Sequence, residues 1–194
     1  MTKTSGPITM PTRIHAGSLA PRGLRERITL SLLALVLMTS ACEGIAQTSD
    51  AERRIASEQL VIKAYSNEVP KVDALLSTFL AAWKTANEKK ELKAYKEDIE
   101  ANVLPALDKF VAASEAMPLG STQLRAIHAP LVSAYQDARE AHRNFLKNVT
   151  VATMDAEYTK VLEAMDKVSK AEEIYLTSMA AYYKEYRVDL QQEP

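Results

Sequence analysis

Apolar side chains recur at spacings of three and four residues through most of the chain after residue 49. In the first such segment the recurring apolar positions are Ile62, Tyr65, Val69, Val72, Leu76, Phe79 and Trp83. This period places the apolar side chains along one face of a helix, as in a helix that packs against others. We therefore predict a helix from Asp50, taken as its cap, to about Thr85.

Three further segments repeat this pattern. The second begins at Leu92 and ends before Pro118-Leu119-Gly120, a sequence that stops a helix. The third follows Ser121, whose hydroxyl suits a helix cap, and the fourth begins near Met154. The main apolar positions are Leu92, Tyr95, Ile99, Val103, Leu107 and Phe110 in the second, Leu124, Leu131, Tyr135, Ala138, Phe145 and Val149 in the third, and Val161, Met165, Val168, Tyr175, Met179, Tyr182 and Tyr186 in the fourth.

Short connections join the four predicted helices, and no segment shows the alternation of a strand. Long helices with short loops favour an antiparallel up-down-up-down four-helix bundle. Pro70, Pro105 and Pro130 each fall inside a predicted helix, where a proline removes a backbone hydrogen bond and kinks the helix. We expect an all-α bundle of long proline-kinked helices over residues 50–188, followed by a frayed tail over residues 189–194.

Polar side chains interrupt the apolar stripes close to the level of the prolines. Pockets in helical bundles are built from such inward-facing polar groups, so His128 and Glu172 form a candidate pocket and are expected within hydrogen-bond reach of each other. The alternative is a cluster of polar groups that satisfy one another. One histidine and one glutamate are too few ligands for a metal ion. His142 lies two heptads from His128, and we place it at a partly exposed end of the seam.

The segment before the bundle, RITLSLLALVLMTSACEG from Arg27 to Gly44, combines preceding arginines, an apolar run and small residues. It ends at Cys42, which is the only cysteine of the chain. This arrangement is typical of a secretory signal. The sequence Met38-Thr39-Ser40-Ala41-Cys42 resembles a bacterial lipobox, although Thr39 stands where leucine is most common. The resemblance implies cleavage after Ala41 and acylation of Cys42.

These features divide the chain into a cleaved signal peptide over residues 1–41, a lipidated tether over residues 42–49, and the bundle. The signal has a long polar n-region, so Met10 rather than Met1 is a possible start. The alternatives for Cys42 are a buried free thiol or an ordinary secretory cleavage nearby. Glu43 follows the cysteine where inner-membrane lipoproteins typically carry aspartate, which favours the outer membrane.

The charge balance excludes some partners. The chain has 24 lysines and arginines against 25 acidic residues, and residues 1–41 hold five basic residues and one acidic one. The part after the signal therefore has 19 basic and 24 acidic residues, a net charge of −5. Nucleic acid binding requires a basic face, so no nucleic acid partner is expected.

The segment Ala180-Ala181-Tyr182-Tyr183-Lys184-Glu185-Tyr186-Arg187 resembles the last helix of the periplasmic cytochromes b562. In that family a histidine of this helix binds haem. Tyr183 occupies the matching position here, and the similarity covers only eight residues. We therefore expect no haem and no other cofactor.

The chain also lacks the motifs that mark common enzyme classes, and the part after residue 41 has only Gly44 and Gly120 as glycines. Catalytic groups are concentrated on loops, which are short here, so we expect no enzyme. The sequence predicts a bundle tethered by lipid to the bacterial cell envelope, facing the periplasm and acting through an envelope protein partner. The alternative is a bundle that binds a small ligand or metal near His128 and Glu172.

Overall fold

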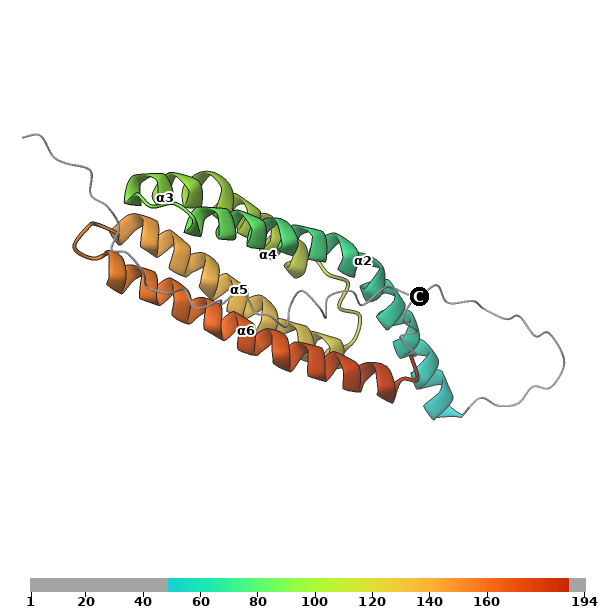
Figure 1. Cartoon of the computed structure of the whole chain (residues 1–194). Helices are drawn as coiled ribbons and strands as arrows, with labels where there is room; N and C mark the ends of the chain where they lie inside the picture. The colour runs from blue at the N-terminus through green and yellow to red at the C-terminus, as the bar shows by residue number, and fades with distance from the viewer. Residues whose placement is uncertain (1–48, 189–194) are drawn as a thin grey trace, which may run out of the picture.

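The computed structural model describes residues 49–188, and this part of the chain is an all-α helical bundle without a strand (Figure 1). The predicted all-α fold is confirmed. The predicted signal peptide and tether, with Cys42, and the tail predicted to fray over residues 189–194 lie outside the described residues. No helix in the described part is long and apolar enough to cross a membrane.

The helical elements match the four predicted segments closely. Helix α2 and helices α5 and α6 are continuous, whereas three consecutive elements make up the second predicted helix. Their bounds are Asp50–Asn87 for α2, Leu92–Asp98 for α3, Ile99–Val103 for the π-helix η1, Leu104–Glu115 for α4, Thr122–Asn148 for α5 and Met154–Glu185 for α6.

The N-terminal caps have clear local causes. Ser49, rather than the predicted Asp50, caps α2: its hydroxyl accepts from the Glu52 N–H, and the Glu52 carboxylate accepts from the Ser49 N–H at 3.1 Å. This reciprocal pair satisfies two backbone donors that the first helical turn leaves free. Ser121 caps α5 as predicted, since its hydroxyl accepts from the Leu124 N–H at 3.1 Å.

Contacts between side chains establish the relative directions of α5 and α6. Ser121 near the start of α5 contacts Tyr182 near the end of α6, and Tyr135 further along α5 contacts Glu172 earlier in α6. The two helices therefore run in opposite directions. They also share the most extensive contact between any two elements of the described chain.

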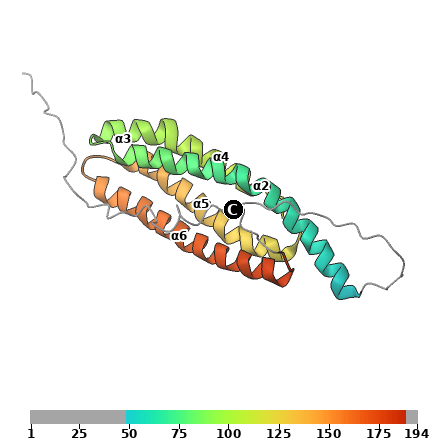
Figure 2. The same cartoon turned by 45° about the vertical axis from the view of Figure 1, so that its right-hand side comes forward.

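Helix α2 runs in the same direction as α5, because Tyr65 and Phe79 of α2 contact His128 and His142 of α5 in the same order. The start of α2 and the start of α5 therefore lie toward the same end of the bundle, which we call the tether end. Figures 1 and 2 show the column of α3, η1 and α4 beside α2, with α5 and α6 as the other pair.

The prolines act in two different ways. Helices α2 and α5 continue through Pro70 and Pro130, and the bend expected at each stays a prediction. Before Pro105 the helix widens instead, and the Leu104 N–H donates to the Ile99 carbonyl five residues earlier. Proline has no N–H and its ring clashes with the carbonyl four residues before it, that of Ala101, so a wider π-turn relieves this clash.

Two clusters of buried apolar side chains form the core. The larger cluster joins all the helices, and Phe79, Ile99, Leu107 and Val111 are among its fully buried members. The smaller cluster lies toward the tether end and contains Ile62, Tyr65, Met117, Leu124, Met179, Tyr182 and Tyr186.

Candidate functional site

His128 lies inside the bundle, with only 4% of its surface exposed. Its ring is held by two neighbouring helices: Nε2 is 2.9 Å from the Ser114 carbonyl oxygen of α4, and Nδ1 is 3.0 Å from the Tyr65 hydroxyl of α2. The rings of His128 and Tyr175 of α6 also pack edge to face, with centroids 6.2 Å apart. His128 therefore contacts side chains or backbone of every other helical column.

The hydrogen-bond partners of His128 show which of its two ring nitrogens carries the hydrogen. A carbonyl can only accept, so Nε2 carries the hydrogen that Ser114 accepts. Burial lowers the pKa of His128 from 6.5, which favours the neutral ring, although the Ser114 carbonyl opposes this shift. The Nδ1 lone pair of the neutral ring accepts from the Tyr65 hydroxyl.

The Tyr65 hydroxyl is also 2.6 Å from the Tyr175 hydroxyl of α6. Because the Tyr65 hydrogen points at His128, the Tyr175 hydroxyl is the donor of this second bond. We call the series formed by Tyr175, Tyr65, His128 and the Ser114 carbonyl the tyrosine–histidine chain. It links α6, α2, α5 and α4 through three hydrogen bonds.

Glu172 belongs to a second polar group. Its side chain on α6 is 9% exposed, and its carboxylate accepts a short hydrogen bond from the Tyr135 hydroxyl of α5. Burial raises the pKa of Glu172, while the bond from Tyr135 opposes the shift. Asp73 of α2 is half-buried, and burial likewise raises its pKa. The carboxylates in this part of the interior are therefore in unfavourable surroundings for their charge.

The predicted hydrogen bond between His128 and Glu172 is wrong. Both side chains face the interior, but His128 bonds to Tyr65 and Ser114, and Glu172 bonds to Tyr135. Sequence reasoning did not predict that tyrosines would be the hydrogen-bond partners of these two side chains. Tyr65, Tyr135 and Tyr175 all occupy apolar-stripe positions, which is the signal that could have identified them.

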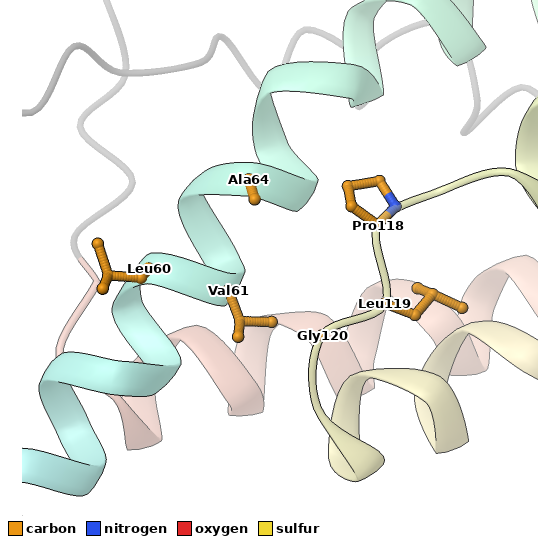
Figure 3. A pocket seen from close by; sticks show the side chains of 6 residues that line it. All are labelled: Leu60, Val61, Ala64, Pro118, Leu119 and Gly120. Carbon is orange, nitrogen blue, oxygen red and sulfur yellow. The ribbon is translucent and has the colours of Figure 1, made fainter.

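Two surface grooves are described, and neither is lined by His128 or Glu172. The first, of about 420 Å³, lies between α2 and the loop before α5 and is lined by Leu60, Val61, Ala64, Pro118, Leu119 and Gly120 (Figure 3). The second, of about 350 Å³, lies between α5 and α6, and its lining includes Ala126, Pro130, Ile174, Ser178 and Ala181. Both grooves are in the tether-end half of the bundle.

His142 is buried rather than partly exposed, with 1% of its surface accessible. Its Nδ1 donates to the Ala138 carbonyl at 2.7 Å, and its ring packs edge to face against Phe79 and Trp83. Within the described residues, neither His142 Nε2 nor Trp83 Nε1 has a hydrogen-bond partner of normal geometry. Burial lowers the pKa of His142, so this imidazole is a neutral part of an aromatic cluster.

The tyrosines near the end of α6 connect helices through their hydroxyl groups. The Tyr182 hydroxyl bonds to Ser121 of α5 and to Glu58 of α2. The Tyr186 hydroxyl accepts from Arg54 of α2 and donates to Gln123 of α5. These contacts join the tether ends of α2, α5 and α6.

Among the described residues, no group of three or more histidine, cysteine, aspartate or glutamate side chains has the arrangement of a metal site. The interior polar groups instead bond to one another across the helices. Comparison of the chain with protein-family models, with curated proteins and with solved structures gave no match.

Proposed function

We propose that the chain is a lipid-anchored helical bundle of the bacterial cell envelope, exposed to the periplasm, and that it acts through contacts with another envelope protein. The observation that carries this proposal is the segment from Arg27 to Gly44. A basic region, an apolar run and small residues precede the single cysteine, Cys42, as in a lipoprotein signal.

The position of α2 fits a short tether. Helix α2 begins after its cap Ser49, which is seven residues beyond Cys42. Seven residues span at most about 25 Å when fully extended. A lipid on Cys42 would therefore hold the tether end of the bundle close to the membrane surface.

The surface and interior of the bundle favour a protein partner over a small ligand. Both grooves lie in the tether-end half, and Leu60 and Ile174 beside them are 70% and 63% exposed. Exposed apolar side chains beside a groove are typical of contact surfaces. The alternative of a ligand or metal site at His128 and Glu172 has less support, because these side chains make their hydrogen bonds to neighbouring residues.

Lipidation is tested by substituting Cys42→Ser in the full chain, expressed in a bacterial host. We expect the wild-type protein to start at residue 42 and to carry acyl mass there, and the variant to remain an unlipidated precursor. Intact-protein and N-terminal peptide mass spectrometry measure both. A wild-type protein without acyl mass on residue 42 contradicts the anchor.

Membrane fractionation tests the destination. The residue after the cysteine is Glu43, so we expect the lipidated protein in the outer-membrane fraction. Glu43→Asp provides the matched variant, since it changes the side chain by one methylene and keeps its charge. Recovery of the wild-type protein wholly in the inner membrane would contradict the outer-membrane prediction. It would not contradict the lipid anchor, which the mass spectrometry tests.

A further inference from the structure

Two buried nitrogen atoms in the aromatic cluster of Phe79, Trp83 and His142 have no hydrogen-bond partner of normal geometry. One is Nε1 of Trp83 on α2, and the other is Nε2 of His142 on α5. Within the described part of the chain, Asp98 has the only other buried side-chain atom of this kind. Buried polar atoms in folded proteins are nearly always hydrogen-bonded, either to the protein or to ordered water. The two nitrogens therefore point to a ligand.

The two nitrogens have complementary hydrogen-bonding roles. The indole Nε1 of Trp83 carries a hydrogen and can only donate. The His142 Nδ1 donates to the Ala138 carbonyl at 2.7 Å, so Nε2 of the neutral ring has a lone pair and can only accept. Burial lowers the pKa of His142, which favours the neutral ring. One unpaired donor and one unpaired acceptor thus belong to neighbouring side chains.

The rings that carry these nitrogens are widely spaced. Trp83 and His142 pack edge to face with centroids 6.2 Å apart, and Phe79 lies 6.4 Å from Trp83 and 6.3 Å from His142. By comparison, the edge-to-face pair of Phe110 and Tyr135 has centroids 4.5 Å apart. Aromatic pairs span about 4.5–7 Å. Three rings that all meet toward the wide end of this range favour a small molecule at their edges.

The chemistry of the two nitrogens selects the ligand. A cation would face the indole hydrogen of Trp83, and an anion would face the lone pair of His142. The ligand must therefore be neutral, accept one hydrogen bond and donate another. It must also be small, because both atoms are buried and neither groove described above is lined by these residues. Water meets these requirements, since it needs only about 10–15 Å³ and two to four polar partners.

The Tyr95 hydroxyl of α3 supplies a third polar group near the indole. Burial raises the pKa of Tyr95, and the Trp83 N–H opposes this shift. The Trp83 N–H nevertheless makes no hydrogen bond of normal geometry to that hydroxyl. Tyr95 is therefore a candidate acceptor for the second hydrogen of a bound water molecule.

We propose that one water molecule binds between Trp83 and His142 inside the bundle, accepts a hydrogen bond from the indole N–H and donates one to Nε2 of the imidazole. The water gives both buried nitrogens a partner and joins α2 to α5 in the half of the bundle away from the tether end. It also holds His142 in the Nδ1–H form, because Nε2 then accepts. This site is independent of the lipid anchor.

The single tryptophan of the chain provides the test. The full chain, labelled with ¹⁵N and purified in detergent micelles, gives one indole N–H signal in nuclear magnetic resonance. Nuclear Overhauser effects between this hydrogen and water are measured in the laboratory frame and in the rotating frame. We expect effects of opposite sign in the two frames, as for a water molecule that is held in place. No effect, or the equal signs that hydrogen exchange produces, overturns the proposal.

His142→Phe removes the acceptor and keeps a ring beside Phe79 and Trp83. We expect the effect of water on the indole hydrogen to be lost, while circular dichroism shows a folded bundle. An effect of unchanged size in the folded variant overturns the bridge. A measurement on the wild type does not depend on how this variant folds: a scalar coupling between Trp83 Nε1 and His142 Nε2 would mean that the rings bond directly, which overturns the water.

Tyr95→Phe is the matched control. A tyrosine hydroxyl exchanges its hydrogen with solvent, so a hydroxyl near the indole can imitate a bound water molecule. The substitution removes this hydroxyl and leaves Trp83 and His142 unchanged, so the effect of water on the indole hydrogen should persist. Loss of the effect in Tyr95→Phe would assign it to the hydroxyl and overturn the proposal.

Discussion

Burial shifts the pKa values of the two titratable side chains that the sequence singled out, His128 and Glu172, in opposite directions. It lowers the pKa of His128 and raises the pKa of Glu172, and in both cases the neutral form gains. For Glu172 the folded state holds its proton more tightly than the unfolded chain does. Its contribution to stability is therefore complete below the ordinary pKa of 4.5 and is lost as the pH rises through the folded value.

Glu172→Gln tests this linkage. Glutamine keeps an acceptor for the Tyr135 hydroxyl and removes the buried charge. We expect the free energy of unfolding at pH 7 to rise, because the amide carries no charge that burial disfavours. Urea denaturation at pH 7 and at pH 4 measures it, and the gain should be smaller at pH 4. A loss of stability at pH 7 would mean that the bond from Tyr135 to the carboxylate outweighs the effect of burial.

At the scale of single elements, the packing of α2 depends on one aromatic side chain. Phe79 is fully buried and contacts the rings of Trp83, Tyr135 and His142. A side chain in such surroundings leaves a cavity when it is truncated, because the neighbouring rings cannot all move inward.

Phe79→Ala should lower the free energy of unfolding by about 3–5 kcal/mol, as for other buried phenylalanines. Leu60→Ala is the control on the same helix, because Leu60 is 70% exposed, and its change should stay within about 0.5 kcal/mol. Chemical denaturation followed by circular dichroism compares the two. Equal effects would show that the assigned buried face of α2 is wrong.

The loop between α4 and α5 approaches α2 so closely at Gly120 that a Cβ there would press against the side chain of Val61. A Cβ added at Gly120 would lie 2.9 Å from Cγ2 of Val61, closer than carbon atoms normally approach (Figure 3). The requirement concerns space: Val61 fills the volume beside the glycine.

Gly120→Ala should therefore destabilise the bundle by about 1–3 kcal/mol, the usual cost of overpacking. In a Val61→Ala background the same substitution should cost much less, because the obstructing methyl groups are gone. A double-mutant cycle of unfolding free energies measures the difference. An equal cost in both backgrounds would show that the backbone conformation at Gly120, rather than the space beside Val61, requires glycine.

At the scale of the whole molecule, the two ends of the bundle differ. The tether end carries both described grooves and the exposed side chains Leu60 and Ile174. The opposite end carries one exposed large apolar residue, Val151, in the connection between α5 and α6. If the bundle binds a partner through its tether end, Leu60 and Ile174 should contact that partner and Val151 should not.

Photo-crosslinking in intact cells tests this difference. A photoreactive residue in place of Leu60 or Ile174 should form a defined adduct with one envelope protein, and the same residue in place of Val151 should not. Electrophoresis and mass spectrometry identify the adduct. Stronger crosslinking at Val151 would move the contact surface to the opposite end.

Much of the fold follows from local signals. The apolar period placed the helices within a few residues, Ser121 capped α5 as expected, and Pro118-Leu119-Gly120 ended the second helical column. Each of these features depends on residues that are close in sequence, through side-chain period, capping and turn chemistry. The π-turn before Pro105 was not predicted, because a proline can be accommodated by a kink or by a wider turn.

The sequence by itself determined the stripe positions of His128 and Glu172, and the signal segment that it indicates stays a prediction. Only the tertiary structure decided their partners, with His128 bonded to Tyr65 and Ser114, and Glu172 bonded to Tyr135. The physical reason is geometric. One residue turns a helix by about 100°, so small differences in rotation and axial shift between helices decide which polar atoms meet. Periodicity identifies the buried face of each helix, and hydrogen bonding across the core then depends on how all four columns pack together.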